Sequence, residues 1–282
     1  MVTFRYVIAD VFTDTPLAGN QLAVFTDSRD IPEDRLQPLA REMNLSETVF
    51  VYEAEGDGHA RIRIFTPVSE LPFAGHPVLG TAFVLAAPLQ LDEIRLETGM
   101  GIVPVGLERE QGRIVFGRMS QPIPTVGPFE RGPELLAALG IEGAELPLER
   151  YESGVGNVYV LLRSEEDVAA VTPDFTVVGR VMGAVHAICI AGSGTRWKMR
   201  MFAPGDGVPE DPATGSAAGP LAVHLARHGR IGFGDEIEIS QGAEIGRPST
   251  LYARVEGTTE HVEKVEVGGS AVIVARGEFR LP

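Results

Sequence analysis

The chain has 282 residues, of which 44% are hydrophobic and 22% charged, which fits two domains of ordinary size, each with its own core. Its formal net charge of −15 opposes binding to nucleic acid or to an acidic membrane surface, because both are polyanions. Cys189 is the only cysteine, which excludes an internal disulfide and a cysteine-based zinc site. No signal peptide and no apolar run of membrane-spanning length is found, so a cytoplasmic location is expected.

The first part of the chain alternates short apolar runs with turn residues. Residues 34–43 have apolar positions at helical spacing, which predicts an amphipathic helix. Residues 77–86 are apolar on every side, which predicts a helix at the centre of a β-structure. Strands are predicted at 6–12, 21–25, 47–51, 59–65, 94–97, 101–105 and 113–116.

Residues 121–129 contain three prolines and a glycine, which predicts a linker between an N-terminal lobe, 1–121, and a C-terminal lobe, 129–282. The sequence leaves open whether the last strand crosses back to the N-terminal lobe. In the second lobe, short helices are predicted at 133–139 and 173–180, and a second buried helix is predicted after Asp211, ending at 227–229. Strands are predicted at 184–191, 197–202, 236–240, 250–256, 262–267 and 270–275, and residues 151–162 are expected to start the second copy of the fold.

Three motifs occur twice in the same order, 135 to 137 residues apart. They are HPVLGTA at 76–82 and DPATGSA at 211–217, RIF-x-P at 63–67 and RMF-x-P at 200–204, and Gly-Asn at 19–20 and 156–157. This spacing predicts two copies of one fold. Because pockets favour domain interfaces, the ligand is expected between the copies.

The prolines of the first motif predict two helix starts. Proline is favoured at the first helical position, so Pro77 and Pro212 are expected to begin the two buried helices. Free amide groups at such a start suit a small molecule with a carboxylate. His76, directly before Pro77, is interpreted either as a cap residue or as a neutral imidazole directed at a ligand. Ser216 suits an anion contact more than a nucleophile, because it lies in a first helical turn.

Two other polar residues also have alternative interpretations. Glu47 stands at the head of a predicted apolar strand. It is interpreted either as an ordinary solvated residue or as a carboxylate near a low-dielectric pocket, where it would be suited to proton transfer. Asn20 is interpreted either as a turn residue or as an amide held in a functional position, because the same Gly-Asn pair recurs at Asn157. His224 and His228 have the spacing of a zinc motif, but no third ligand is evident in the sequence, so no metal is expected and His228 is predicted to be exposed.

Several segments together resemble the phenazine-biosynthesis PhzF-like family, along nearly the whole chain. They include Asp10-Val11-Phe12 with Gly19-Asn20, Met43-Asn44-Leu45-Ser46-Glu47, Ile64-Phe65-Thr66-Pro67, Glu70 to Pro77, Arg200-Met201-Phe202, Glu210-Asp211 with Ala213 to Ala222, and Gln241-Gly242 with Ile245 to Ser249.

The resemblance implies the diaminopimelate epimerase-like fold, an α+β fold of two pseudo-symmetric lobes, each a mostly antiparallel β-barrel around a central apolar helix. It also implies a cofactor-free isomerase, usually a homodimer, that acts on a small anionic cyclic amino acid. The family's catalytic positions fall on Glu47, His76, Asp211 and Ser216, and its substrate contacts on or beside Asn20, Ser46, Gly75, Thr214 and Gly215. Epimerases of this fold place a cysteine in each half, where this chain has Ala74 and Thr214, so a two-thiol mechanism is excluded.

The function expected from this resemblance is the isomerisation of trans-2,3-dihydro-3-hydroxyanthranilate, in which Glu47 moves a proton from C3 to C1. Two alternatives remain open at this point. One is a related isomerase of another small amino or hydroxy acid, and the other is a protein that binds a carboxylate without catalysis.

Overall fold

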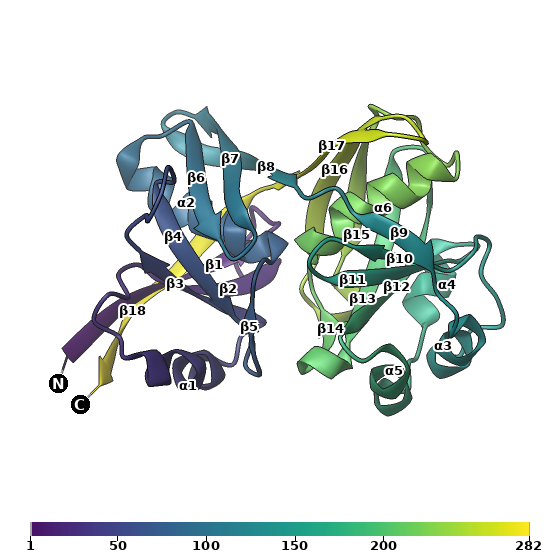
Figure 1. Ribbon diagram of the computed structural model, residues 1–282, viewed down its shortest axis with the longest axis horizontal. Helices are drawn as coiled ribbons and strands as arrows, with labels where there is room; N and C mark the ends of the chain where they lie inside the picture. Colours follow the sequence, from purple (N-terminus) through teal and green to yellow (C-terminus); the bar gives the residue numbers. More distant parts are fainter. Residues whose placement is uncertain (1, 282) are drawn as a thin grey trace. The chain divides into compact units, whose positions relative to one another are not determined.

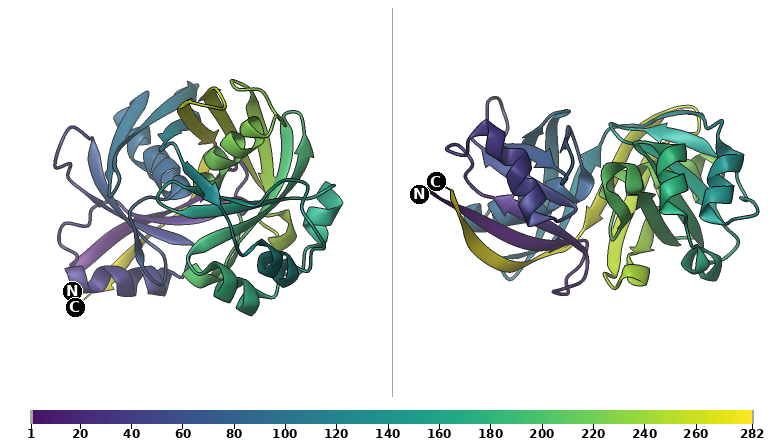
Figure 2. Two further views of the ribbon diagram at one scale, coloured as in Figure 1. Left: turned by 45° about the vertical axis from the view of Figure 1, so that its right-hand side comes forward. Right: turned by 90° about the horizontal axis from the view of Figure 1, so that it is seen from below.

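The chain, described over residues 2–281 by a computed structural model, divides into two compact units. Unit 1 extends to Ser120 and also contains the segment from Gly268 onward, while unit 2 is Gln121–Val267. The first and last strands, β1 (Val2–Val11) and β18 (Ala271–Leu281), pair antiparallel and lie side by side in unit 1 (Figures 1 and 2). The last strand therefore belongs to the sheet that the N-terminal residues begin.

Unit 1 is a twisted sheet with two helical connections. Its parallel pairs are β2–β3 and β4–β6, and the other pairings are antiparallel. Parallel neighbours need a crossover connection, which α1 (Glu33–Met43) and α2 (Gly75–Leu89) supply. The remaining strands are β2 (Asn20–Phe25), β3 (Glu47–Tyr52), β4 (Ala60–Phe65), β5 (Glu70–Leu71), β6 (Glu93–Thr98), β7 (Gly101–Glu110) and β8 (Arg113–Gln121).

Helix α2 is the core of unit 1. Its first eight residues are all buried, and it packs against β1, β2, β3, β6, β7 and β18 (Figure 1). At Gly80 the helix approaches the strands closely, because a Cβ there would lie 2.6 Å from Val11 Cγ2 and 2.7 Å from Leu22 Cδ2. The central apolar helix that the sequence predicts is thus confirmed.

Unit 2 repeats this order of pairings around α6 (Gly215–Arg227). Its parallel pairs are β11–β12 and β13–β15, again joined by helical crossovers. Its strands are β9 (Thr125–Pro128), β10 (Glu149–Glu152), β11 (Gly156–Leu161), β12 (Val185–Ser193), β13 (Arg196–Ala203), β14 (Val208–Asp211), β15 (Glu236–Gln241), β16 (Ser249–Gly257) and β17 (Val262–Gly269). The other helices are α3 (Gly132–Leu139), α4 (Glu165–Ala170), α5 (Phe175–Met182) and the 3-10 turns η1 (Pro204–Asp206) and η2 (Ala243–Ile245).

The predicted starts of both central helices are wrong by a few residues. α2 begins at Gly75 and α6 at Gly215, so His76 is the second helical residue instead of a cap, and Asp211 ends strand β14. None of the first four amide groups of a helix has a partner within the helix, so proline is tolerated beyond the first position. The structural repeat consequently pairs His76 with Ser216, whereas the sequence motif pairs His76 with Asp211.

The proline-rich stretch 121–129 is more ordered than a linker. Its residues Thr125–Pro128 form β9, which pairs antiparallel with β10. Proline is compatible with a strand where its missing N–H is not needed by the ladder. Cys189 lies in β12 inside the core of unit 2, as its apolar surroundings in the sequence predict.

None of the helices within residues 2–281 combines the length and the apolar character needed to cross a lipid bilayer.

Candidate active site

The start of α2 in unit 1 gathers three of the predicted site residues. His76 is 3% exposed, and its Nε2 lies 3.1 Å from Glu47 Oε2, while its Nδ1 lies 3.2 Å from Asn20 Nδ2. The Glu47 side chain is 13% exposed, so the interpretation of this residue as an ordinary solvated carboxylate is wrong.

Local structure explains why these side chains meet. Asn44, in the left-handed region at φ 50°, ends α1 and leaves a two-residue connection that places Glu47 at the head of β3. Gly19, at φ 68°, turns the chain into β2, and a Cβ there would lie 2.5 Å from Val11 O. Glycine is the residue that this position tolerates, and it places Asn20 as the first residue of β2.

The burial of His76 decides its charge. Loss of solvent disfavours the imidazolium and lowers the pKa of His76 to about 3, so the ring is neutral at neutral pH. The amide nitrogen of Asn20 can only donate, so Nδ1 accepts and Nε2 carries the proton of the neutral ring. The contact is therefore a close polar contact between a neutral ring and a carboxyl group, 3.1 Å apart, and it brings Glu47 and His76 together at the start of α2.

The remaining predicted residues of unit 1 flank this group. Ser46 directly precedes β3 and is partly exposed, and Gly75 is the buried first residue of α2. The amide groups of the first helical turn have no partners within the helix, and they lie at the positive end of its dipole. This end can hold an anionic group, as the sequence predicts for a carboxylate-bearing ligand.

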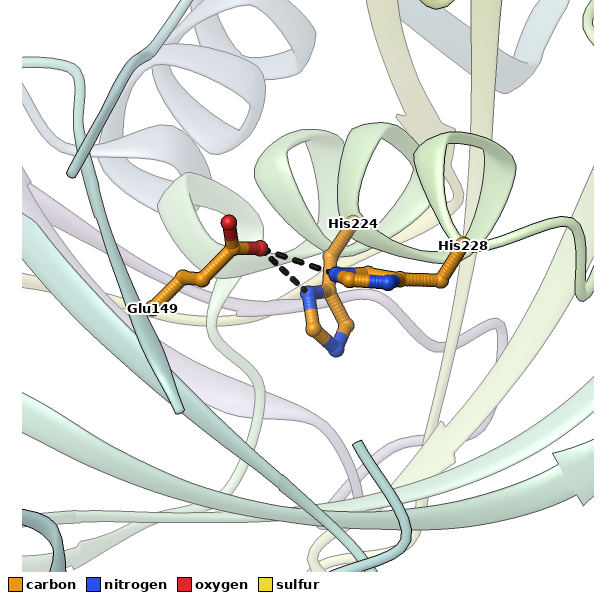
Figure 3. Close-up of side chains that lie close together, drawn as sticks. All are labelled: Glu149, His224 and His228. Atoms are coloured by element: carbon orange, nitrogen blue, oxygen red, sulfur yellow. Dashed lines mark hydrogen bonds and ion pairs between the residues drawn. The ribbon is translucent and has the colours of Figure 1, made fainter. Parts of the chain in front are cut away.

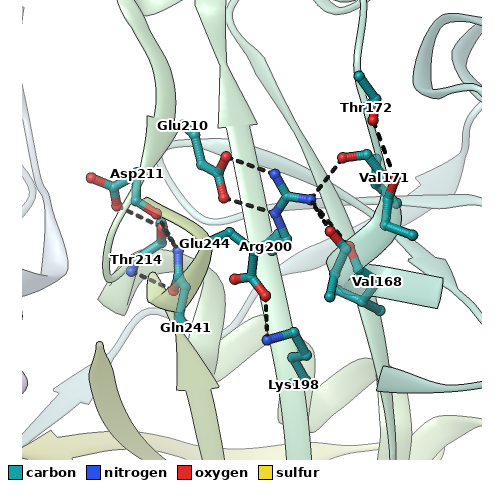
Figure 4. A network of polar contacts seen from close by, with 12 residues as sticks. Val168, Val171, Thr172, Lys198, Arg200, Glu210, Asp211, Thr214, Gln241 and Glu244 are labelled. Carbon is teal, nitrogen blue, oxygen red and sulfur yellow. Dashed lines mark hydrogen bonds and ion pairs between the residues drawn. The ribbon is translucent and has the colours of Figure 1, made fainter. Parts of the chain in front are cut away.

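The predicted residues of unit 2 gather at the start of α6. Asp211 is 5% exposed and its Oδ2 accepts a hydrogen bond of 2.6 Å from Thr214 Oγ1 (Figure 4). Gly215 and Ser216 are the first two residues of α6, and Ser216 is 6% exposed. Asp211, Thr214 and Ser216 are thus brought to one helix start, as the sequence predicts.

Two further residues support this region, although the sequence assigned them no role. Gln241, at the end of β15, donates to the main chain of Asp211 and to the hydroxyl of Thr214 (Figure 4). Arg200 in β13 forms a two-pronged ion pair with Glu210, at 2.8 Å for each contact. Both residues lie in the segments that carry the family resemblance, and Arg200 also begins the repeated motif at 200–204.

A second polar cluster in unit 2 contains the two histidines of the zinc-like spacing. His224 and His228 rise from one face of α6 toward Glu149, so a potential third ligand does exist (Figure 3). Contrary to the prediction, the His228 side chain is only 22% exposed, and its Nε2 lies 2.9 Å from Glu149 Oε2.

Hydrogen bonding accounts for this cluster better than a metal does. Glu149 Oε2 also accepts from Tyr151 OH at 2.9 Å, and Tyr151 OH lies 3.0 Å from His224 Nδ1. The guanidinium of Arg227 lies 3.4 Å from the same Glu149 oxygen, where its charge would repel a cation. We therefore interpret the cluster as a network that joins β10 to α6.

Cys189 is unsuited to nucleophilic chemistry. It is fully buried, and burial raises the pKa of its thiol to about 12. Ala74 and Thr214 are the N-cap residues of the two central helices, where the resemblance places the thiols of epimerases. A mechanism with two thiols is consequently not available to this chain.

Solved structures with the same fold include racemases and epimerases. A probable proline racemase from Agrobacterium radiobacter K84 is 12% identical, with a TM-score of 0.71 over 99% of this chain and 93% of that one. A PhzF-family phenazine biosynthesis protein from Bacillus anthracis is 25% identical, with a TM-score of 0.85 over 100% of both chains. These similarities confirm the predicted diaminopimelate epimerase-like fold.

The sequence comparisons narrow this class to one family. The family model described as phenazine biosynthesis-like protein matches residues 9–277. A Pseudomonas aeruginosa protein named trans-2,3-dihydro-3-hydroxyanthranilate isomerase is 54% identical over 278 residues, which cover 98% of this chain and 99% of that protein. A Pseudomonas fluorescens protein of the same name is 50% identical over 280 residues, again covering 98% and 99%. The chain belongs to the phenazine biosynthesis-like (PhzF) family.

Proposed function

We propose that this chain is a trans-2,3-dihydro-3-hydroxyanthranilate isomerase of phenazine biosynthesis that works by acid/base catalysis. The substrate assignment rests on the full-length identity of 50% and 54% to proteins of that name. The single structural observation that supports the chemistry is the buried contact of 3.1 Å between Glu47 and a neutral His76.

In this proposal Glu47 is the proton carrier. Its carboxylate takes a proton from C3 of the substrate, the diene electrons shift, and the resulting acid returns the proton to C1. A positioned acid/base group of this kind contributes on the order of 10²–10⁴ in rate. His76 is neutral, so it can donate to Glu47 without competing for the transferred proton.

The residues of unit 2 are proposed to act in the same reaction. Ser216 and the free amide groups at the starts of α2 and α6 would hold the substrate carboxylate. Asp211, together with His76, would fix the amino and hydroxyl groups of the substrate or relay protons at the substrate ring. The substrate would be contacted by the remaining predicted residues, Asn20, Ser46, Gly75, Thr214 and Gly215. No step of this proposal requires a cofactor.

A second candidate is an isomerase of the same family with a different small amino or hydroxy acid as substrate. It is supported by relatives of 31% and 34% identity, from Clostridium acetobutylicum and Deinococcus radiodurans, that are named only as uncharacterized isomerases.

The test is turnover of the phenazine precursor in D₂O, followed by mass spectrometry. The wild-type chain is expected to form the isomer, and Glu47→Gln to lose at least about 10²-fold in kcat, because the amide keeps the size and removes the base. Glu53→Gln is the matched control, since the Glu53 side chain is 78% exposed. Turnover by Glu47→Gln near the wild-type rate would contradict the mechanism. A folded wild-type chain that binds the precursor without product or deuterium exchange would indicate a binding protein.

The homodimer that the family resemblance implies and the cytoplasmic location expected from the sequence are also part of this proposal. Light scattering of the purified chain measures its oligomeric state, and cell fractionation measures its location.

A further inference from the structure

Gln241 connects strand β15 to the segment that carries Asp211. It is 2% exposed, and its amide makes three hydrogen bonds, all to Asp211 or Thr214. The next residue, Gly242 at φ 80°, packs so closely that a Cβ would lie 2.5 Å from Pro212 O. The end of β15 therefore contacts the Asp211–Thr214 segment through both side chain and main chain.

The partners of Gln241 fix the orientation of its amide. The Thr214 N–H can only donate, and it lies 2.9 Å from Oε1, while the Asp211 carbonyl can only accept, and it lies 2.8 Å from Nε2. The second hydrogen of Nε2 is then directed to Thr214 Oγ1, at 3.0 Å.

This orientation also fixes the hydroxyl proton of Thr214. Because the hydroxyl oxygen accepts from Gln241, its own hydrogen is directed to Asp211 Oδ2, at 2.6 Å. Such a short bond is typical of a hydroxyl donating to a carboxylate.

We propose that Gln241 is a positioning residue for the reaction: through Thr214 it fixes the rotamer of Asp211, whose carboxylate is proposed to act on the substrate. The inference deepens the proposed function and rests on it for the role of Asp211. Without Gln241 the Thr214 hydroxyl can rotate away, and the Asp211 carboxylate loses the hydrogen bond of this hydroxyl.

The kinetic test replaces Gln241 with a residue of similar size that cannot donate. Gln241→Met is expected to lower kcat about 10²-fold, because a small misplacement of a catalytic group has effects of this size, and to change KM much less. Gln37→Met is the matched control, since Gln37 Nε2 makes one bond, to Thr66 O, in unit 1. A folded Gln241→Met with kcat within about 3-fold of wild type would overturn the inference.

A double-mutant cycle separates positioning from a general structural role. If Gln241 acts through Asp211, then Gln241→Met should add less than about 3-fold to the loss that Asp211→Asn causes alone. Losses in kcat that multiply would show that Gln241 acts elsewhere and would overturn the inference. If Gln241→Met fails to fold, Thr214→Val takes its place, because it breaks the same relay and keeps the main-chain bonds of Gln241.

Hydrogen exchange provides a readout that does not depend on the substrate. The Thr214 amide, which donates to Gln241, is expected to exchange faster in Gln241→Met than in the wild type, with Gln37→Met unchanged. Unchanged exchange would overturn the inference. Faster exchange in a chain that does not turn over the precursor would support the positioning role and contradict the proposed function instead.

Discussion

At the scale of single residues, buried charges organise the surroundings of the candidate site. Arg200 is 6% exposed, and besides its two contacts with Glu210 it donates to the carbonyls of Val168, Ala169 and Val171 (Figure 4). These carbonyls lie at the end of α4, where a cation is favoured. Arg200 thus joins α4 and β13 to the residue that directly precedes Asp211.

Removing Arg200 is expected to destabilise the fold strongly. Arg200→Met leaves Glu210, whose side chain is 7% exposed, as a buried carboxylate without its cation, which costs about 3–5 kcal/mol. Arg29→Met is the control, because its pairs with Asp27 and Glu53 are exposed to solvent, so their loss is expected to change the stability far less. Urea unfolding measures both. Equal losses in the two variants would show that the Arg200 pair is not the buried anchor that we describe.

At the scale of elements, each central helix relies on a close approach to its surroundings. Gly80 of α2 faces Val11 and Leu22, both fully buried, and Gly219 of α6 has Gln121 and Val265 within 2.7 Å of where a Cβ would be. A glycine inside a helix is intrinsically unfavourable compared with alanine. The tight packing of the helices accounts for glycine at both positions.

Gly80→Ala is expected to destabilise unit 1 although alanine favours helices. The added methyl group overlaps two buried side chains, and such overpacking costs about 1–3 kcal/mol. Gly143→Ala is the control, because nothing lies within 4 Å of its Cβ position. Thermal unfolding compares the two variants. A Gly80→Ala protein as stable as the wild type would mean that the strands move aside easily.

At the scale of the whole molecule, each unit contains a histidine kept neutral by burial. Burial lowers the pKa of His76 in unit 1 and of His224 in unit 2 to about 3. His224 is fully buried and stacks on Tyr159, with ring centroids 5.3 Å apart. In the unfolded chain both rings take up a proton near pH 6.5, as free histidines do.

Stability is therefore expected to fall in acid. Below about pH 6.5 the unfolded chain binds protons that the folded chain does not, so the free energy of unfolding decreases until about pH 3, by up to about 1.4 kcal/mol per pH unit for each histidine. Urea unfolding across this range measures the slope. His224→Gln should reduce the slope of the unfolding free energy against pH by the contribution of one histidine, up to about 1.4 kcal/mol per pH unit. His261→Gln, which changes an exposed residue, serves as the control. An unchanged slope in His224→Gln would contradict the assignment.

The sequence by itself predicted most of the helices and strands, but it did not predict α4 and assigned the residues of β9 to a linker. Helical spacing over residues 34–43 predicted α1, and an apolar surface on every side predicted the buried α2, because burial leaves its pattern in the order of residues. The family resemblance led to Glu47, His76 and Asp211 before any contact was known. Their catalytic roles remain predictions.

Only the tertiary structure decided the register and the partners. A proline in the first turn does not mark the first helical residue, so the helix starts at Gly75 and Gly215 depended on packing. The contacts Glu47–His76, Gln241–Thr214 and Glu149–His228 join residues far apart in the chain. Local sequence patterns do not predict such contacts, because the contacts form only when strands from different parts of the sequence come together around a helix.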